Sequence, residues 1–162
     1  MHITKIQQSD DGLSVSFREN TGEESGFKGE TSTKKEPTPE FSEAFRALRP
    51  IIRDVNGFPH DWATDLILRA IIFRERHDGR RQARIYADRV SQHVAVGRSA
   101  KLIETKTPWI FISGNDTNYM LHRQGIEAIE VLEDEAVNYV KGSRAQQTMS
   151  FEEEKQEATS LI

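Results

Sequence analysis

Two Asp-Gly pairs, at positions 11–12 and 78–79, limit the folds open to this chain more than any other feature. Each pair lies between runs rich in apolar and β-branched residues. Asp-Gly is typical of β-hairpin turns, because glycine adopts the positive φ angles that such turns need. Leu13, Val15 and Phe17 alternate with serines, as the residues of a half-buried strand do. We therefore expect two hairpins. The first has strands near 3–7 and 13–18, and the second begins near Leu66 and returns near 82–90.

The remaining elements follow from periodicity and from breaking residues. We expect an edge strand or a loop over 26–33 and a short buried strand over 108–114. A helix should begin after Thr38 and run to Val55, broken near its third turn because proline at position 50 cannot donate a backbone hydrogen bond. A last helix should span 119–141 and end at Gly142. Residues 62–76 also fit a helical period, but Asp78-Gly79 favours the hairpin.

This order of elements predicts an α+β fold: a small antiparallel sheet or an OB-like barrel, with a helix after the third strand and a C-terminal helix. With 162 residues the chain has the size of one domain. We expect one globular domain over 1–142 and a flexible acidic tail over 143–162, because the tail is polar and rich in glutamate.

Composition argues against several classes of function. The chain has no cysteine, which excludes disulfides, thiolate nucleophiles and cysteine-based metal sites. Its five histidines show no metal-ligand spacing, and no phosphate-binding glycine loop or nucleophile motif is present. We expect no catalytic residues, no metal and no cofactor, and hence no enzyme. No apolar run reaches the ~20 residues of a membrane helix, so we expect a cytoplasmic protein.

Charge is divided unevenly along the chain, although the net charge is only −4. Between Arg69 and Lys101 there are nine basic and three acidic residues, whereas from Ile126 onward nine acidic residues face three basic ones. The central segment is therefore a candidate anion-binding surface, and the last segment is acidic.

The basic segment coincides with the second hairpin and carries aromatic residues. Single-stranded nucleic acid is bound by cationic grooves that follow the phosphates and by rings that stack on bases. Arginine suits this task, because its planar guanidinium binds phosphate with two hydrogen bonds. The candidate binding residues are Arg69, Phe73, Arg74, Arg76, Arg80, Arg81, Arg84, Tyr86 and Trp109. In the alternative interpretation, Phe73 and Tyr86 belong to the core and the arginines are solvated or pair with the acidic helix.

The tail contains a second candidate site. Gln146, Met149 and Phe151 have the spacing of the short peptide that docks on the bacterial sliding clamp in an extended conformation, although Gln147 stands where that peptide usually has an aliphatic residue. We expect these residues to dock on the clamp or another replication protein. The glutamates 152–154 could shield the basic surface while nucleic acid is absent.

Three separated blocks resemble small uncharacterised proteins of tailed phages and prophages. They are the opening residues 1–7, the segment Phe41-Ser42-Glu43-Ala44-Phe45-Arg46-Ala47-Leu48-Arg49-Pro50, and the helix ending Tyr139-Val140-Lys141-Gly142-Ser143-Arg144-Ala145-Gln146. The resemblance implies a phage origin, and hence the cytoplasm of a bacterial host, and a gene that neighbours replication and recombination genes. It implies no catalytic residues.

These observations predict a phage replication or recombination accessory protein that binds single-stranded nucleic acid and docks a partner through its tail. The alternative is an anti-defence protein that sequesters a phosphorylated host signalling nucleotide or inhibits a host protein. Shape separates the two. A closed basic pocket between subunits of a homo-oligomer would favour the nucleotide, and an open groove would favour the strand.

Overall fold

The structure is a computed structural model, and it describes residues 1–160 apart from 11, 20–26, 34–36, 62–65, 92–100 and 115–119. Within these residues the elements in chain order are β1 (His2–Ser9), β2 (Gly12–Glu19), β3 (Phe27–Thr33), α1 (Pro39–Arg46), α2 (Arg49–Asn56), β4 (Leu66–Glu75), β5 (Arg81–Ser91), β6 (Lys101–Lys106), β7 (Ile110–Phe111) and α3 (Arg123–Ser160). The predicted α+β class, with a helix after the third strand and a C-terminal helix, is confirmed.

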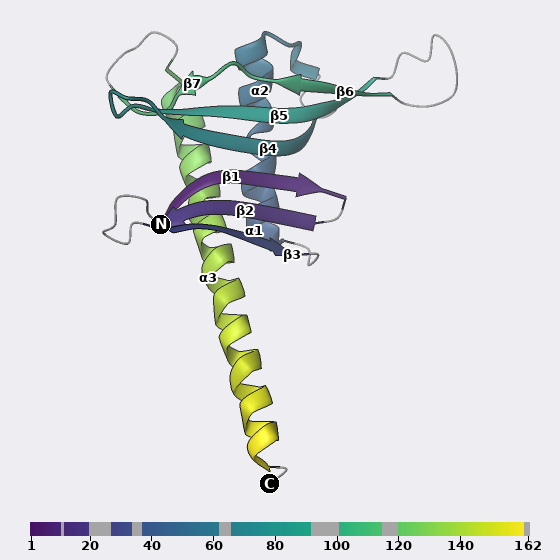
Figure 1. The fold of residues 1–162 in the computed structure, drawn as a ribbon. Coiled ribbons are helices and arrows are strands. Elements are labelled where there is room, and N and C mark those ends of the chain that lie inside the picture. The colour runs from purple at the N-terminus through teal and green to yellow at the C-terminus, as the bar shows by residue number, and fades with distance from the viewer. Residues whose placement is uncertain are drawn as a thin grey trace.

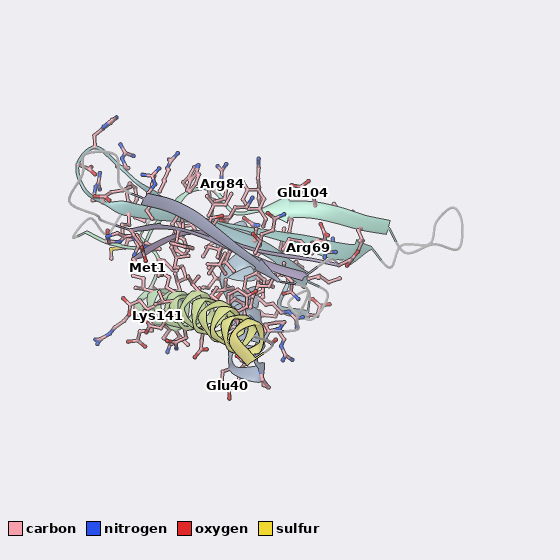
Figure 2. All side chains as sticks on the ribbon, turned by 60° about the horizontal axis from the view of Figure 1, so that its bottom comes forward. Met1, Glu40, Arg69, Arg84, Glu104 and Lys141 are labelled. Atoms are coloured by element: carbon pink, nitrogen blue, oxygen red, sulfur yellow. The ribbon has the colours of Figure 1, made fainter. Side chains whose placement is uncertain are left out.

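The strands form one open antiparallel sheet in the order β3-β2-β1-β4-β5-β6, with β7 beside β5 (Figure 1). Two three-stranded meanders meet at the β1–β4 pair, so the order is symmetrical about the centre of the sheet. The OB-like barrel is wrong, because β3 and β6 are the two edges and do not pair with each other. All the described helices lie on one face of the sheet (Figure 2).

The predicted break in the first helix is confirmed. Thr38 caps α1 by accepting a hydrogen bond from the backbone N–H of Phe41 on its Oγ1, at 3.2 Å. The helix stops at Arg46 and a second one starts at Arg49, with proline in its first turn, where a missing N–H does no harm. Gly57 ends α2 with a φ of 67°, a left-handed conformation that glycine adopts without strain.

The second hairpin forms as expected, so the helical alternative for 66–75 is wrong. Its loop has three residues, His77, Asp78 and Gly79, instead of the two that an Asp-Gly turn most often has. The N–H of Gly79 donates to the carbonyl of Arg76, and the N–H of Arg76 donates to the carbonyl of Arg80. Gly79 has a φ of 82°. This is a type I turn followed by a left-handed glycine, the usual three-residue hairpin loop.

The last helix continues to Ser160, so the prediction that it ends at Gly142 is wrong. A glycine inside a helix costs only about 1 kcal/mol relative to alanine, and the alanine and glutamines that follow favour helix. The C-terminal half of α3 runs past β3 and away from the sheet (Figure 1). The side chains of 143–160 and the whole of residues 161 and 162 lie outside the described part of the chain. The predicted flexibility of the tail over 143–162 therefore stays a prediction.

The core lies between the sheet and the helices. Ile6, Val15, Ile71 and Ile85 project from the strands, and Leu132 projects from α3; each is fully buried. On the other side of the sheet, which we call the outer face, no described helix covers the strands (Figure 2). Among the helices that the structure describes, none is long and apolar enough to cross a membrane.

Candidate nucleic-acid interface

Strand register determines which side chains share the outer face. Residues that pair across an antiparallel sheet point to the same side, and neighbours along a strand alternate. Four rows of outer side chains lie across β4, β5 and the segment 106–111, which contains the end of β6 and all of β7. From the hairpin loop onward these rows are Arg76 and Arg80; Arg74, Gln82 and Phe111; Ile72, Arg84 and Trp109; Ala70, Tyr86 and Lys106. Arg84 lies on the side of the sheet away from α3 (Figure 2).

Trp109 reaches the outer face because the chain is pinned to β5 on both sides of it. Pro108 has no N–H, so the ladder between β5 and β6 cannot continue through it. The buried Thr107 bridges the gap: its Oγ1 accepts from the N–H of Ile85 at 3.0 Å, and its own N–H donates to the carbonyl of Ile85 at 3.0 Å. Pairing resumes at Ile110 with Ala83. Trp109 therefore stands opposite Arg84.

Two guanidinium groups lie against the indole ring of Trp109. The Cζ of Arg74 is 4.0 Å from the ring centroid and the Cζ of Arg84 is 4.9 Å from it, both within the range of a cation–π contact. The Nε of Arg74 also donates to the Oε1 of Gln82 at 2.7 Å, and Gln82 is itself buried. These contacts hold the two cations close together on the outer face.

A second aromatic ring continues the pattern toward the hairpin loop. The Cζ atoms of Arg80 and Arg76 lie 4.4 and 5.6 Å from the ring centroid of Phe111. Sequence reasoning places Phe111 in a buried strand and misses this contact. Its position two residues after Trp109 was the available signal, because alternate residues of a strand share a face.

Asp78 offsets part of the positive charge at the loop. It accepts a hydrogen bond from the backbone N–H of Arg80 at 3.1 Å, and it forms an ion pair with the Arg80 side chain at 2.8 Å. These two interactions hold the pKa of the Asp78 carboxyl below its usual range. Asp78 therefore stays ionised throughout the neutral range and becomes protonated only when the pH falls through the lowered pKa.

Three predicted binding residues are occupied by contacts within the protein. Phe73 lies in the core on the helix side, so the expectation that it stacks on a base is wrong. Arg81 also faces the helices, where it pairs with Glu133 of α3 at 3.0 Å. Arg69 pairs with Asp88 at 2.6 Å. For Arg81, the alternative interpretation of pairing with the acidic helix is confirmed.

Three arginines of the outer face have no acidic partner among the described residues. Arg74, Arg76 and Arg84 make no ion pair with any residue that the structure describes, and the buried Nε of Arg84 has no hydrogen-bond partner there. Tyr86 lies on the outer face beside Lys106, partly exposed. The predicted residues that come together on this face are thus Arg74, Arg76, Arg80, Arg84, Tyr86 and Trp109.

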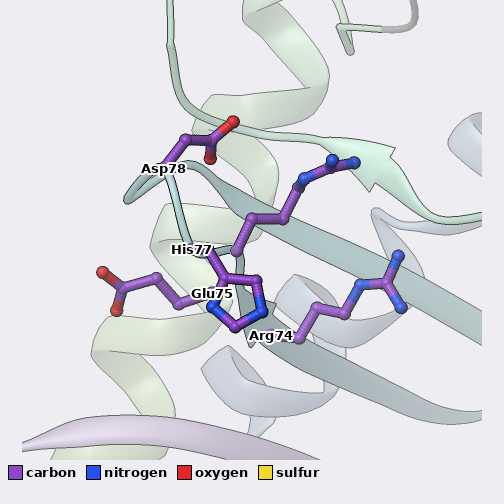
Figure 3. A pocket seen from close by; sticks show the side chains of 5 residues that line it. Arg74, Glu75, His77 and Asp78 are labelled. Atoms are coloured by element: carbon purple, nitrogen blue, oxygen red, sulfur yellow. The ribbon is translucent and has the colours of Figure 1, made fainter.

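A hollow lies at the base of the hairpin loop, next to these rows (Figure 3). It has a volume of about 580 Å³ and is lined by Arg74, Glu75, Arg76, His77 and Asp78. Two of these residues are acidic, which weakens the hollow as a phosphate site. In the described part of the chain, no group of His, Asp and Glu could hold a metal ion.

The predicted docking residues Gln146, Met149 and Phe151 fall on α3, whose backbone is helical there. Their side chains are outside the described part of the chain. Docking in the extended form that the motif requires would need this part of the helix to unwind.

The sequence matches no protein-family model and no curated protein, and no solved structure matches the chain.

Proposed function

We propose that this chain binds single-stranded nucleic acid on the outer face of its sheet, without catalysing a reaction. The observation that carries the proposal is the combination of Arg74, Arg84 and Trp109. Two arginines that make no ion pair in the described structure are gathered over one partly exposed indole ring. Cations for phosphates and rings for unpaired bases are the two components of such binding surfaces.

Arg84 adds a chemical reason for an anionic ligand. A buried hydrogen-bond donor without an acceptor costs about 1–3 kcal/mol, and native proteins leave few such groups unsatisfied. The Nε of Arg84 is one of them within the described residues. The Nε itself is shielded from solvent, so a phosphate oxygen would form its charge-assisted hydrogen bonds with the terminal nitrogens of this guanidinium.

The biological setting that we propose is phage replication or recombination, where single strands are exposed. Docking of α3 residues Gln146, Met149 and Phe151 on the sliding clamp or another replication protein remains part of this proposal. The anti-defence alternative has two forms, inhibition of a host protein and capture of a phosphorylated nucleotide, and the second requires the nucleotide to bind tightly on its own. The hollow at the loop has a suitable volume, but its lining carries Glu75 and Asp78 and so does not favour that ligand.

A fluorescently labelled single-stranded dT12 should bind the protein, with an affinity that falls steeply between 50 and 200 mM salt because phosphate contacts release counterions. Fluorescence anisotropy measures the dissociation constant at each salt concentration.

The intrinsic tryptophan emission should fall at saturation, and Trp109→Leu should remove most of that change. Absence of binding at low salt would disprove the proposed function. Tighter binding of a mononucleotide than of dT12 would favour the anti-defence alternative.

Asp78→Asn should strengthen binding of dT12 about two- to fivefold at low salt, because it removes the negative charge that Asp78 places beside Arg80. The asparagine oxygen still accepts the hydrogen bond from the Arg80 N–H, so the turn is kept. Asp54→Asn is the matched control, since Asp54 also pairs with an adjacent arginine but lies on α2. Equal effects of the two variants would show that the loop is not part of the interface.

A further inference from the structure

The charge on the outer face changes sign along β5. From the hairpin loop to the row of Tyr86 and Lys106, each row contributes at least one basic side chain. The next row consists of Ile67, Asp88 and Glu104, and it is acidic. Both Arg84, on β5, and Glu104, on β6, lie on the outer face (Figure 2).

The two acids of this row are not equivalent. Asp88 is held by Arg69 at 2.6 Å, so most of its charge is offset. Glu104 is exposed and makes no ion pair within the residues that the structure describes. Glu104 therefore presents an uncompensated negative charge directly beyond the last basic row, where the next phosphate of a bound strand would come.

The rows of Arg84 and Tyr86 gain little positive charge where they continue across the sheet onto β1 and β2. On β1 the outer residues in the adjoining rows are Lys5 and Gln7, and on β2 they are Ser14 and Ser16. Lys5 is thus the one cation among these four, although the next outer position of β2 is the exposed Arg18. A strand bound through its phosphates should follow β5 instead of crossing toward β3.

We infer that the interface holds a short single-stranded segment of about four nucleotides, and that Glu104 ends it; this inference rests on the proposed function. The Arg76–Arg80 row and the Tyr86 row are six residues apart along β5. At ~3.4 Å per residue, the basic rows therefore span about 20 Å. That length corresponds to the lower end of site sizes for single-strand binding domains, ~4 nucleotides. Trp109 and Tyr86 lie in neighbouring rows of this segment, and a base that stacks on Trp109 would displace the Arg74 or Arg84 guanidinium from its ring.

The length of the site can be measured with the full chain and oligonucleotides dT2, dT4, dT6, dT8 and dT12, titrated by anisotropy at low salt. Affinity should rise steeply up to about four nucleotides and afterwards only by the statistical factor for additional registers. A duplex of the same length should bind more weakly than dT12, because its bases cannot stack on the two rings.

Glu104→Lys should extend the site by adding one phosphate contact. It should tighten binding of dT8 by about three- to tenfold at low salt and change binding of dT4 little. Lysine is a tolerated residue on an edge strand such as β6. Glu130→Lys makes the same charge change at an exposed position of α3, on the helix side of the sheet, and should affect dT4 and dT8 equally.

The outcomes separate this inference from the proposed function. If no oligonucleotide binds, both are wrong. If the wild type binds but its affinity keeps rising steeply to dT12, or if Glu104→Lys acts on dT4 and dT8 as Glu130→Lys does, the four-nucleotide limit is wrong and the proposed function stands. Selective tightening of dT8 by Glu104→Lys supports both.

Discussion

Replacing Arg74 and Arg84 together by glutamine should weaken binding of dT12 by about 10- to 100-fold at low salt, because each position then lacks its charge-assisted hydrogen bonds to phosphate. The slope of log affinity against log salt should become shallower by about 1.4, or ~0.7 for each phosphate of a single strand that the variant no longer neutralises. The methylene groups and planar amide of glutamine keep part of the packing against Trp109. Anisotropy titrations at four salt concentrations measure both quantities.

The control for this variant changes two arginines on the helix side. Arg46 on α1 and Arg123 on α3 are both exposed, so Arg46→Gln with Arg123→Gln removes the same net charge from the other face. A loss of affinity confined to the Arg74 and Arg84 variant supports a site on the outer face. Equal losses in the two double variants would mean that the chain attracts nucleic acid only through its overall charge.

Leu132→Ala should lower the free energy of unfolding by about 3 kcal/mol, because it leaves a cavity where α3 packs against the sheet. Leu132 is fully buried, whereas its neighbour Val131 is 54% exposed. Val131→Ala changes the same helix at the adjacent position and should alter stability by less than ~0.5 kcal/mol. Urea unfolding followed by circular dichroism measures both differences.

Comparing the single variants Leu132→Ala and Val131→Ala tests whether α3 is packed against the sheet as an integral part of the fold. Ile129, Leu132, Ala136 and Val140 form one buried stripe on the helix, and Arg81 of β5 pairs with Glu133 beside it. If Leu132→Ala were as mild as Val131→Ala, the helix would not be packed against the sheet as the structure has it. The helix-covered face would then be wrongly assigned, and with it the outer face.

Local sequence alone was sufficient for much of the fold. The alternation of Leu13, Val15 and Phe17 and the Asp78-Gly79 turn predicted the two hairpins, because a strand has a side-chain period of two and glycine favours the loop conformation. Thr38 and Pro50 predicted the start and the break of the first helix for equally local reasons. Each of these signals acts within a few residues along the chain.

Other predictions failed because propensity is weak compared with packing. Gly142 did not end α3, since one glycine costs little in a helix whose preceding turns are fixed by buried contacts. β6 carries no clear period in the sequence, yet it pairs with β5 from Tyr86 to Ser91. An edge strand forms its backbone hydrogen bonds with a neighbouring strand, and the residues of the edge strand alone do not show which strand that is.

The order of the elements and the concentration of arginine on one hairpin follow from the amino-acid sequence. The face that each arginine occupies follows from tertiary packing instead. Arg81 and Arg84 lie three residues apart on the same strand, yet Arg81 pairs with Glu133 under the sheet while Arg84 lies over Trp109 on the outer face. The reason is physical: alternation along a strand assigns side chains to two faces, but the face that is buried depends on where the helices pack.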